Sequence, residues 1–174
     1  MNRSYHFKWG TDLNCKIFGE GSLHAKVFLL GDNQEQDFLT RESKELLTKI
    51  LKSIEIDLQT VFISNVLQFS SSKNQLDEIA ENILDQQLTI IQPAIICTWG
   101  IASFQALLNT QDSIADFHGN ILKYFLKSSA QVVPVLATYH PVDLFKDESL
   151  KRIVWNDMKK LRDFLASHSN KFSK

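Results

Sequence analysis

Four short apolar segments, each followed at once by polar or small residues, constrain the fold of this chain more than any other feature. Between them lie longer segments whose apolar residues recur at the three- and four-residue spacing of an amphipathic helix. Strands that alternate with helices form parallel sheets covered on both faces. The order therefore predicts a three-layer α/β/α fold with a central, mostly parallel four-stranded sheet. The predicted strands are residues 26–30, 60–64, 94–98 and 132–138.

The intervening segments are predicted to be helices, over residues 43–54, 75–91, 100–108 and 147–165. Pro93 ends the second helix, because proline cannot continue the helical hydrogen bonds. Asp147 is a suitable N-cap for the last helix. Pro134 has no N–H to donate within a sheet, so we expect the fourth strand to lie at an edge of the sheet or at a bulge.

Length and composition indicate a single globular domain over residues 1–174. The chain is 44% hydrophobic and 22% charged, which is ordinary for a globular protein. A chain of this length buries enough surface to be stable without disulfides or metals. No apolar segment approaches the roughly 18 residues of a membrane span, and the first residues have no apolar core of signal-peptide length. We therefore expect a cytoplasmic protein.

Charge and cysteine content narrow the possible ligands. Nineteen Lys and Arg residues face twenty Asp and Glu residues, for a net charge of −1. Tight non-specific nucleic-acid binders usually carry a basic excess, so a DNA-binding face would depend on local clustering of Lys and Arg. Cys15 and Cys97 lie far apart and form no ligand pattern. No other His, Cys or carboxylate spacing indicates a metal site.

Polar residues follow the predicted strands at the points where these strands end. Asp32 comes shortly after the first strand, Asn65 follows the second, Gly100 follows the third and His140 follows the fourth. In open α/β sheets, ligands bind outside the carboxyl ends of the strands. The sequence therefore predicts a candidate active site around Asp32, Asn65 and His140.

Each of these three side chains also has a purely structural alternative. Asp32 would then form a turn or a cap, and Asn65 would satisfy its own backbone in an Asx turn. His140, which precedes Pro141, would be a packed loop residue. The residue types and their spacing are compatible with both interpretations.

Four segments, in this order and spacing, carry a resemblance to a known family. They read IFGEGSLHAKVFLLG over residues 17–31, VFISNVL over residues 61–67, PAIICTWG over residues 93–100, and TYHP over residues 138–141 with KRIVWND at residues 151–157. Together they resemble family 4 of the bacterial and archaeal uracil-DNA glycosylases. The resemblance covers roughly residues 17–165, most of the chain.

The resemblance implies base excision, in which a nucleotide is flipped out of the stack and its base is recognised in a pocket. It implies that Asn65 contacts the edge of uracil through its amide. His140 would hydrogen-bond uracil O2, where negative charge grows as the glycosidic bond breaks, and Asp32 would position water. The further substrate-binding residues that it implies are Gly31, Phe38 and Pro141.

The chain also departs from the family pattern. The loop after Gly31 is shorter and reads DNQEQ. The family's iron–sulfur cluster is held by four cysteines, and no such cofactor is expected here because other residues stand at those positions. The counterparts of the four cysteines are Ser4, Phe7, Phe69 and Ala80. Residues 144–146, Leu-Phe-Lys, replace the usual Leu-Arg region of the loop that would enter the DNA groove.

Three functions remain open from the sequence. The first is an active or weakly active uracil-DNA glycosylase, a monomer whose partner is uracil-containing DNA. The second is a catalytically inactive member of the same fold that binds replication or repair proteins, as the psi subunit of the bacterial clamp loader does. The third is an unrelated α/β nucleotide-binding domain. Fold alone does not choose among them.

Overall fold

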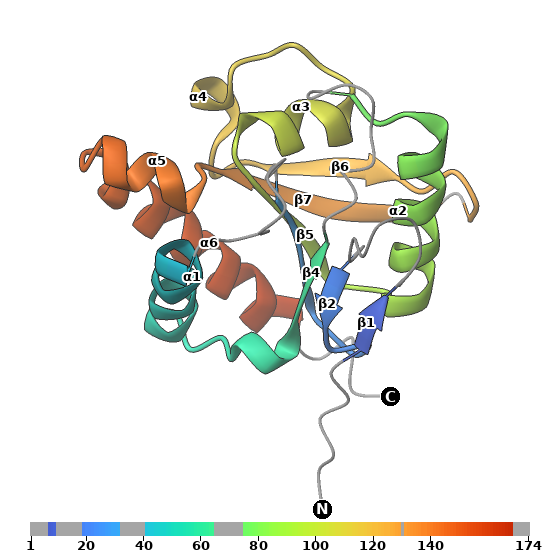
Figure 1. Ribbon diagram of the computed structural model, residues 1–174, viewed down its shortest axis with the longest axis horizontal. Helices are drawn as coiled ribbons and strands as arrows, with labels where there is room; N and C mark the ends of the chain where they lie inside the picture. Colours follow the sequence, from blue (N-terminus) through green and yellow to red (C-terminus); the bar gives the residue numbers. More distant parts are fainter. Residues whose placement is uncertain (1–6, 10–18, 32–40, 65–74, 130, 169–174) are drawn as a thin grey trace, which may run out of the picture.

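The computed structural model describes residues 7–9, 19–31, 41–64, 75–129 and 131–168. Its sheet has seven strands in the order β1-β2-β4-β3-β5-β7-β6. Figure 1 shows this sheet between two groups of helices. The strands are β1 (Phe7–Trp9), β2 (Gly19–Gly21), β3 (Val27–Gly31), β4 (Val61–Ser64), β5 (Ile95–Trp99), β6 (Ile121–Phe125) and β7 (Val132–Thr138). The helices are α1 (Arg41–Ser53), α2 (Glu78–Ile91), α3 (Ile101–Leu108), α4 (Ile114–Phe117), α5 (Pro141–Lys146) and α6 (Leu150–His168), with a 3₁₀ turn over Leu58–Thr60.

The four predicted strands form the centre of the sheet. They correspond to β3, β4, β5 and β7, and every pairing among them is parallel. The α/β prediction is confirmed and its four strands are all parallel to one another, but the prediction of a mostly parallel sheet of only four strands is wrong. Three antiparallel strands extend the edges, with β2 and β1 beyond β4 and β6 beyond β7.

The missed edge strands have weak sequence signals. β1 and β2 are three residues long, and β2 contains Gly19 and Gly21, which are unfavourable in strands. A Cβ at Gly21 would lie 2.3 Å from the carbonyl oxygen of Val61, and its φ is +135°. This close approach to β4 therefore requires glycine. β6 alternates between exposed and partly buried residues, the pattern of a strand with one covered face.

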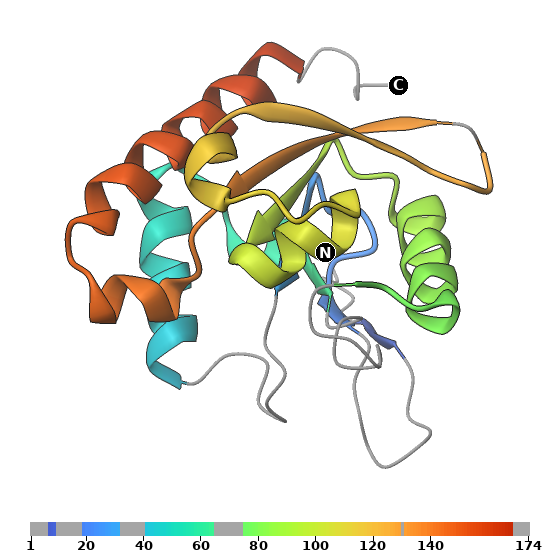
Figure 2. The same ribbon diagram turned by 90° about the horizontal axis from the view of Figure 1, so that it is seen from above.

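Two helical layers cover the sheet, as Figures 1 and 2 show. One core cluster joins α2 and α3 to one face through residues such as Phe28, Phe62 and Leu84. The other joins α1, α5 and α6 to the opposite face through residues such as Leu51 and Met158. All five of these side chains are fully buried, and each contributes about 1.5–3 kcal/mol to folding through the apolar surface it removes from water. The three-layer α/β/α prediction is confirmed.

The prediction for Pro134 is wrong, because β7 lies inside the sheet between β5 and β6. Pro134 is paired with Lys123 of β6. Pairing between β7 and β5 begins one residue later, at Val135. The missing N–H of Pro134 therefore leaves the pairing with β5 intact, and a proline is accommodated in an interior strand.

The prediction that Asp147 caps one long helix is also wrong in detail. A separate helix, α5, precedes it, and Asp147 is the C-cap of α5. The Asp147 carboxylate accepts a hydrogen bond of 2.9 Å from the N–H of Ser149, and α6 begins at Leu150. Asp147 therefore forms the turn between two helices.

Among the helices of the described residues, none combines the length and apolar character that crossing a bilayer requires.

Candidate functional site

The carboxyl ends of the four parallel strands lie at one edge of the sheet. Gly31 at the end of β3 is paired with Trp99 at the end of β5, and Trp99 is paired with Thr138 at the end of β7. Ser64, the last residue of β4, is paired with Leu30 of β3. The strands thus end in register, and the segments that follow them begin at a common rim.

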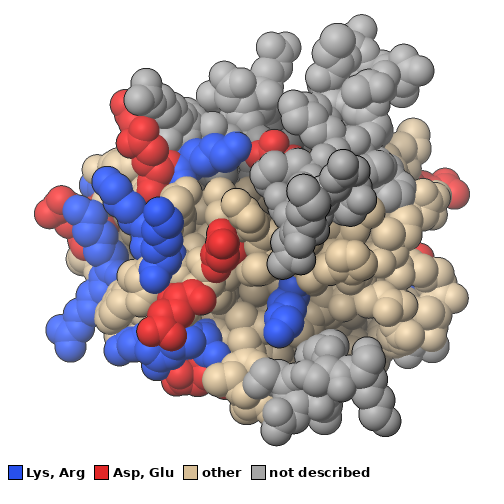
Figure 3. All heavy atoms as spheres, turned by 90° about the horizontal axis from the view of Figure 1, so that it is seen from below, with Lys and Arg blue, Asp and Glu red and all other residues tan. Residues whose placement is uncertain are grey.

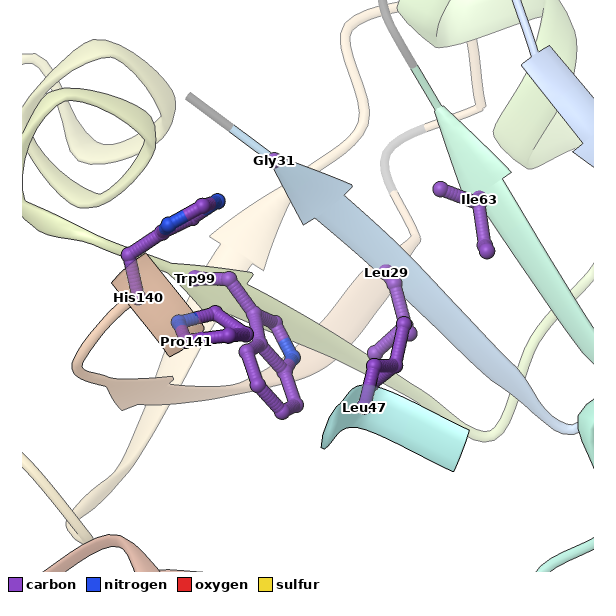
Figure 4. A pocket seen from close by; sticks show the side chains of 7 residues that line it. All are labelled: Leu29, Gly31, Leu47, Ile63, Trp99, His140 and Pro141. Atoms are coloured by element: carbon purple, nitrogen blue, oxygen red, sulfur yellow. The ribbon is translucent and has the colours of Figure 1, made fainter. Parts of the chain in front are cut away.

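A pocket at this rim brings together three of the predicted site residues. Its lining consists of Leu29, Gly31, Leu47, Ile63, Trp99, His140 and Pro141. Figure 4 shows the His140 ring pointing from the end of β7 towards Gly31 at the end of β3. Gly31, His140 and Pro141 were predicted from the sequence. The others are apolar core positions, and Leu47 comes from the buried face of α1.

The pocket is small and apolar. It measures about 10 Å³, which is room for about one water molecule and far below the roughly 300 Å³ of a typical ligand pocket. These residues therefore form the floor of a site rather than a complete pocket for a base. Asp32, Phe38 and Asn65 were predicted to contribute to the same site, and they lie outside the described residues.

His140 is the N-cap of α5. Its φ and ψ of −71° and 144° are extended, and its Nδ1 accepts a hydrogen bond of 3.2 Å from the N–H of Val142. Pro141 occupies the first helical position, where the missing N–H costs nothing. The side chain of His140 is buried, with 6% of its surface exposed. This capping contact was not predicted from the sequence, although His-Pro before a short apolar segment fits a helix start.

The capping contact fixes the tautomer of the neutral His140 ring. A nitrogen that accepts a hydrogen bond carries no proton, so Nδ1 is unprotonated. The single ring proton of the neutral imidazole therefore lies on Nε2, which becomes a hydrogen-bond donor. Protonation of Nδ1 would break the contact with Val142. The local fold thus favours the Nε2–H tautomer of His140 at the rim.

The neighbouring Tyr139 lines a different space from His140. It borders a surface groove of about 300 Å³ formed by Ile101, Ile114, Tyr139, Asp143, Lys146, Asp147 and Leu150. Burial raises the pKa of Tyr139 above its usual value, and the nearby carboxylates of Asp157, Asp116 and Asp143 raise it further. The phenol therefore keeps its proton at neutral pH. Adjacent residues at the end of β7 line two separate spaces.

Charges of both signs occur together on the surface. On the face shown in Figure 3, Lys and Arg side chains are interspersed with Asp and Glu side chains. Ion pairs between described residues include Lys44 with Glu20 at 2.9 Å and Lys151 with Glu148 at 2.6 Å. The charges of the described residues are therefore partly compensated locally, which fits the net charge of −1.

The residues present do not fit a four-cysteine iron–sulfur cluster. The whole chain contains two cysteines, and Cys97 is fully buried in the middle of β5. Burial raises the pKa of the Cys97 thiol. Ala80, at one of the four corresponding positions, is packed in the hydrophobic core. Among the described residues, no group of three or more His, Cys, Asp or Glu side chains could hold a metal ion.

Comparison with known proteins agrees with this architecture. The family model of the uracil DNA glycosylase superfamily matches residues 18–159. A type-4 uracil-DNA glycosylase of Sulfurisphaera tokodaii is 31% identical over 162 residues, which cover 83% of this chain and 72% of that protein.

Two further relatives carry the same description. The type-4 uracil-DNA glycosylase of Archaeoglobus fulgidus is 28% identical, over 82% of this chain and 78% of the relative. That of Saccharolobus solfataricus is 24% identical, over 86% of this chain and 76% of the relative. With the family model matching most of its length, the chain belongs to the uracil-DNA glycosylase superfamily.

Proposed function

We propose that this protein hydrolyses the N-glycosidic bond between uracil and deoxyribose in DNA. The observation that carries the proposal is His140, oriented at the rim pocket by its contact with Val142, which favours the Nε2–H tautomer. Membership of the superfamily and the similarity to three type-4 uracil-DNA glycosylases support it. No observation on the described residues favours an inactive scaffold, so we do not propose that alternative.

The reaction breaks the bond between C1′ of the sugar and N1 of uracil, and the electron pair of this bond moves into the base. Negative charge then grows on uracil O2. His140 would donate its Nε2 proton in a hydrogen bond to O2, and a donor placed where charge develops lowers the barrier by about 3 kcal/mol. Because the ring is already oriented by its capping contact, little reorganisation is needed during the reaction.

The remaining roles belong to residues at the ends of the neighbouring strands. Asn65 would pair with the edge of uracil through its amide, which disfavours cytosine because a mismatched donor would be left buried and unpaired. Asp32 would hold the water that attacks C1′ and take its proton, so that the products are free uracil and an abasic site. Phe38 would stack on the base. Gly31 and Pro141, which border the rim pocket, would form its wall.

We further propose that this chemistry proceeds without an iron–sulfur cluster. The two cysteines of the chain cannot supply four thiolate ligands. The visible absorption spectrum of the purified protein is therefore expected to contain no iron–sulfur band. A brown preparation with such a band would contradict this part of the proposal.

The experiment that tests the function uses uracil-containing oligonucleotides, single-stranded and duplex, incubated with an excess of protein and then treated with alkali to reveal abasic sites. We expect cleavage at uracil by the wild type, and strong loss in His140→Ala and Asn65→Ala. His24→Ala, at an exposed histidine, is the matched control and should retain activity. Absence of cleavage by the wild type at protein excess would contradict the proposal.

A further inference from the structure

Asp157 of α6 is a buried carboxylate outside the rim pocket. One per cent of its surface is exposed. One carboxylate oxygen accepts a hydrogen bond of 2.8 Å from the hydroxyl of Thr138, and the other lies 3.1 Å from Nδ1 of His118. The side chain thus joins α6 to the end of β7 and to the turn before β6.

Stability alone does not explain a carboxylate at this position. Burial raises the pKa of Asp157, and the hydrogen bonds from His118 and Thr138, with the charges of His118 and Lys160, offset this only in part. The charged form is therefore costly to bury. A well-packed apolar side chain in place of a buried charged group is often neutral or stabilising. This cost indicates that Asp157 has a role other than stability, in the residues that it holds in place.

Asp157 acts on the residue that leads directly to the candidate site. Thr138 is the last residue of β7 and is followed by Tyr139 and His140. Its hydroxyl is bound by Asp157, and its carbonyl accepts a hydrogen bond of 2.9 Å from the N–H of Gly100. The hydroxyl and the carbonyl of Thr138 are therefore both fixed, from two different elements.

The turn before β6 is fitted closely around the same carboxylate. Gly119 donates a backbone hydrogen bond of 2.9 Å to the carbonyl of Ala137. A Cβ at Gly119 would lie 2.3 Å from Oδ1 of Asp157 and 2.8 Å from Nζ of Lys160. The turn can approach β7 and Asp157 this closely because residue 119 has no side chain. Three elements thus converge on residues 137 and 138.

We propose that Asp157 is a positioning residue for His140: by holding Thr138 it sets where the His140 ring is presented at the rim pocket. This inference rests on the proposed glycosylase function. Asp157 does not line the rim pocket. A displacement of about 1 Å at a reacting group can reduce a rate by about 100-fold, so loss of Asp157 should affect the rate of bond cleavage more than the affinity for DNA.

The kinetic test compares Asp157→Ala, Asp157→Asn and the control Asp163→Ala, which changes an exposed carboxylate on the same helix. Rates are measured under single-turnover conditions well below the melting temperature of each variant. We expect the single-turnover rate constant at saturating protein to fall about 10- to 100-fold in Asp157→Ala, with the protein concentration that gives half of the maximal rate nearly unchanged. Asp157→Asn should recover much of the rate, because an amide can accept from Thr138 and donate to His118.

A double-mutant cycle distinguishes positioning from general stability. If Asp157 acts through His140, Asp157→Ala should cause no further loss in a His140→Ala background. Equal fold losses in both backgrounds, or an unchanged single-turnover rate constant with only a lower melting temperature, would overturn the inference.

A second readout does not require activity. The imidazole ¹⁵N resonances of His140 report the contact of Nδ1 with Val142. Asp157→Ala should shift these resonances, and Asp163→Ala should not. If the wild type cleaves nothing, the proposed function fails, yet this comparison still decides whether Asp157 positions His140. Unchanged His140 resonances in Asp157→Ala would overturn the inference independently of the function.

Discussion

The ends of β4 and β7 are built alike and differ in one chemical respect. Each strand ends in a fully buried hydroxyl residue, Ser64 or Thr138, just before a predicted site residue. The Ser64 hydroxyl donates to Oε1 of Gln87 at 2.7 Å, and the Thr138 hydroxyl donates to Oδ2 of Asp157 at 2.8 Å. Gln87 lies on α2 and Asp157 on α6, which cover opposite faces of the sheet.

The difference between the two ends is charge. Gln87 is a neutral amide that does not titrate, whereas Asp157 is a carboxylate whose pKa is raised by burial. The strand end before Asn65 is therefore held in a way that does not depend on pH. The strand end before His140 is held by an ionisable group. The two strand ends of the candidate site are thus held by side chains of different chemistry, the neutral Gln87 at β4 and the ionisable Asp157 at β7. This difference can be measured.

The largest effect is expected from removing the donor at the β7 end while keeping its helix cap. In His140→Ser, the hydroxyl can still cap α5 but cannot reach the base as the ring does. We expect the single-turnover rate to fall about 100-fold, equivalent to about 3 kcal/mol, and the free energy of unfolding to change by less than about 1 kcal/mol. Activity close to that of the wild type would show that His140 serves only as a cap.

The second largest effect is expected on stability, from removing the neutral amide of Gln87 at the β4 end. Gln87→Leu leaves the buried hydroxyl of Ser64 without this partner, and we expect a loss of about 1–3 kcal/mol in the free energy of unfolding, measured with urea. The double variant Ser64→Ala/Gln87→Leu should recover part of the loss, because replacing both partners removes the unpaired group. A double variant less stable than Gln87→Leu would contradict this account of the β4 end.

The smallest effect is the pH dependence that should distinguish the two ends. Because the pKa of Asp157 is raised by folding, its contribution to stability is present below its ordinary pKa and is lost as pH rises through the raised value. The wild type should therefore lose stability relative to Asp157→Asn as the pH is raised from about 4 to 7. The difference between the wild type and Gln87→Leu should stay constant over this range. Urea unfolding at several pH values measures both differences in the free energy of unfolding. A difference between the wild type and Asp157→Asn that stays constant with pH would contradict the prediction that Asp157 holds the β7 end as an ionisable group.

Sequence analysis predicted the parts of the fold that depend on strong local patterns. The buried strands β3, β4, β5 and β7 and the amphipathic α1 and α2 were all found, because continuous apolar runs and helical spacing are strong signals. It missed β2, where close contact between strands rather than propensity selects glycine. It also missed α5, whose six residues are too few to show a helical period.

The candidate site was only partly accessible from the sequence. The rule that ligands bind at the carboxyl ends of strands led to His140, and the family resemblance led to Gly31 and Pro141; these three residues border one pocket. The support of His140 by Asp157 could not be found in this way. Thr138 and Asp157 are separated by 19 positions, and only the packing of α6 against β7 brings them together. Asp32, Phe38 and Asn65 lie outside the described residues, and their roles remain predictions.

The most direct test of the account is release of free uracil under single-turnover conditions. Three oligonucleotides that differ at one position, carrying uracil, thymine or cytosine, are incubated with excess wild-type protein and the freed base is measured. The account predicts release from the uracil oligonucleotide, with cytosine and thymine retained. No release of uracil from either single-stranded or duplex DNA would contradict it.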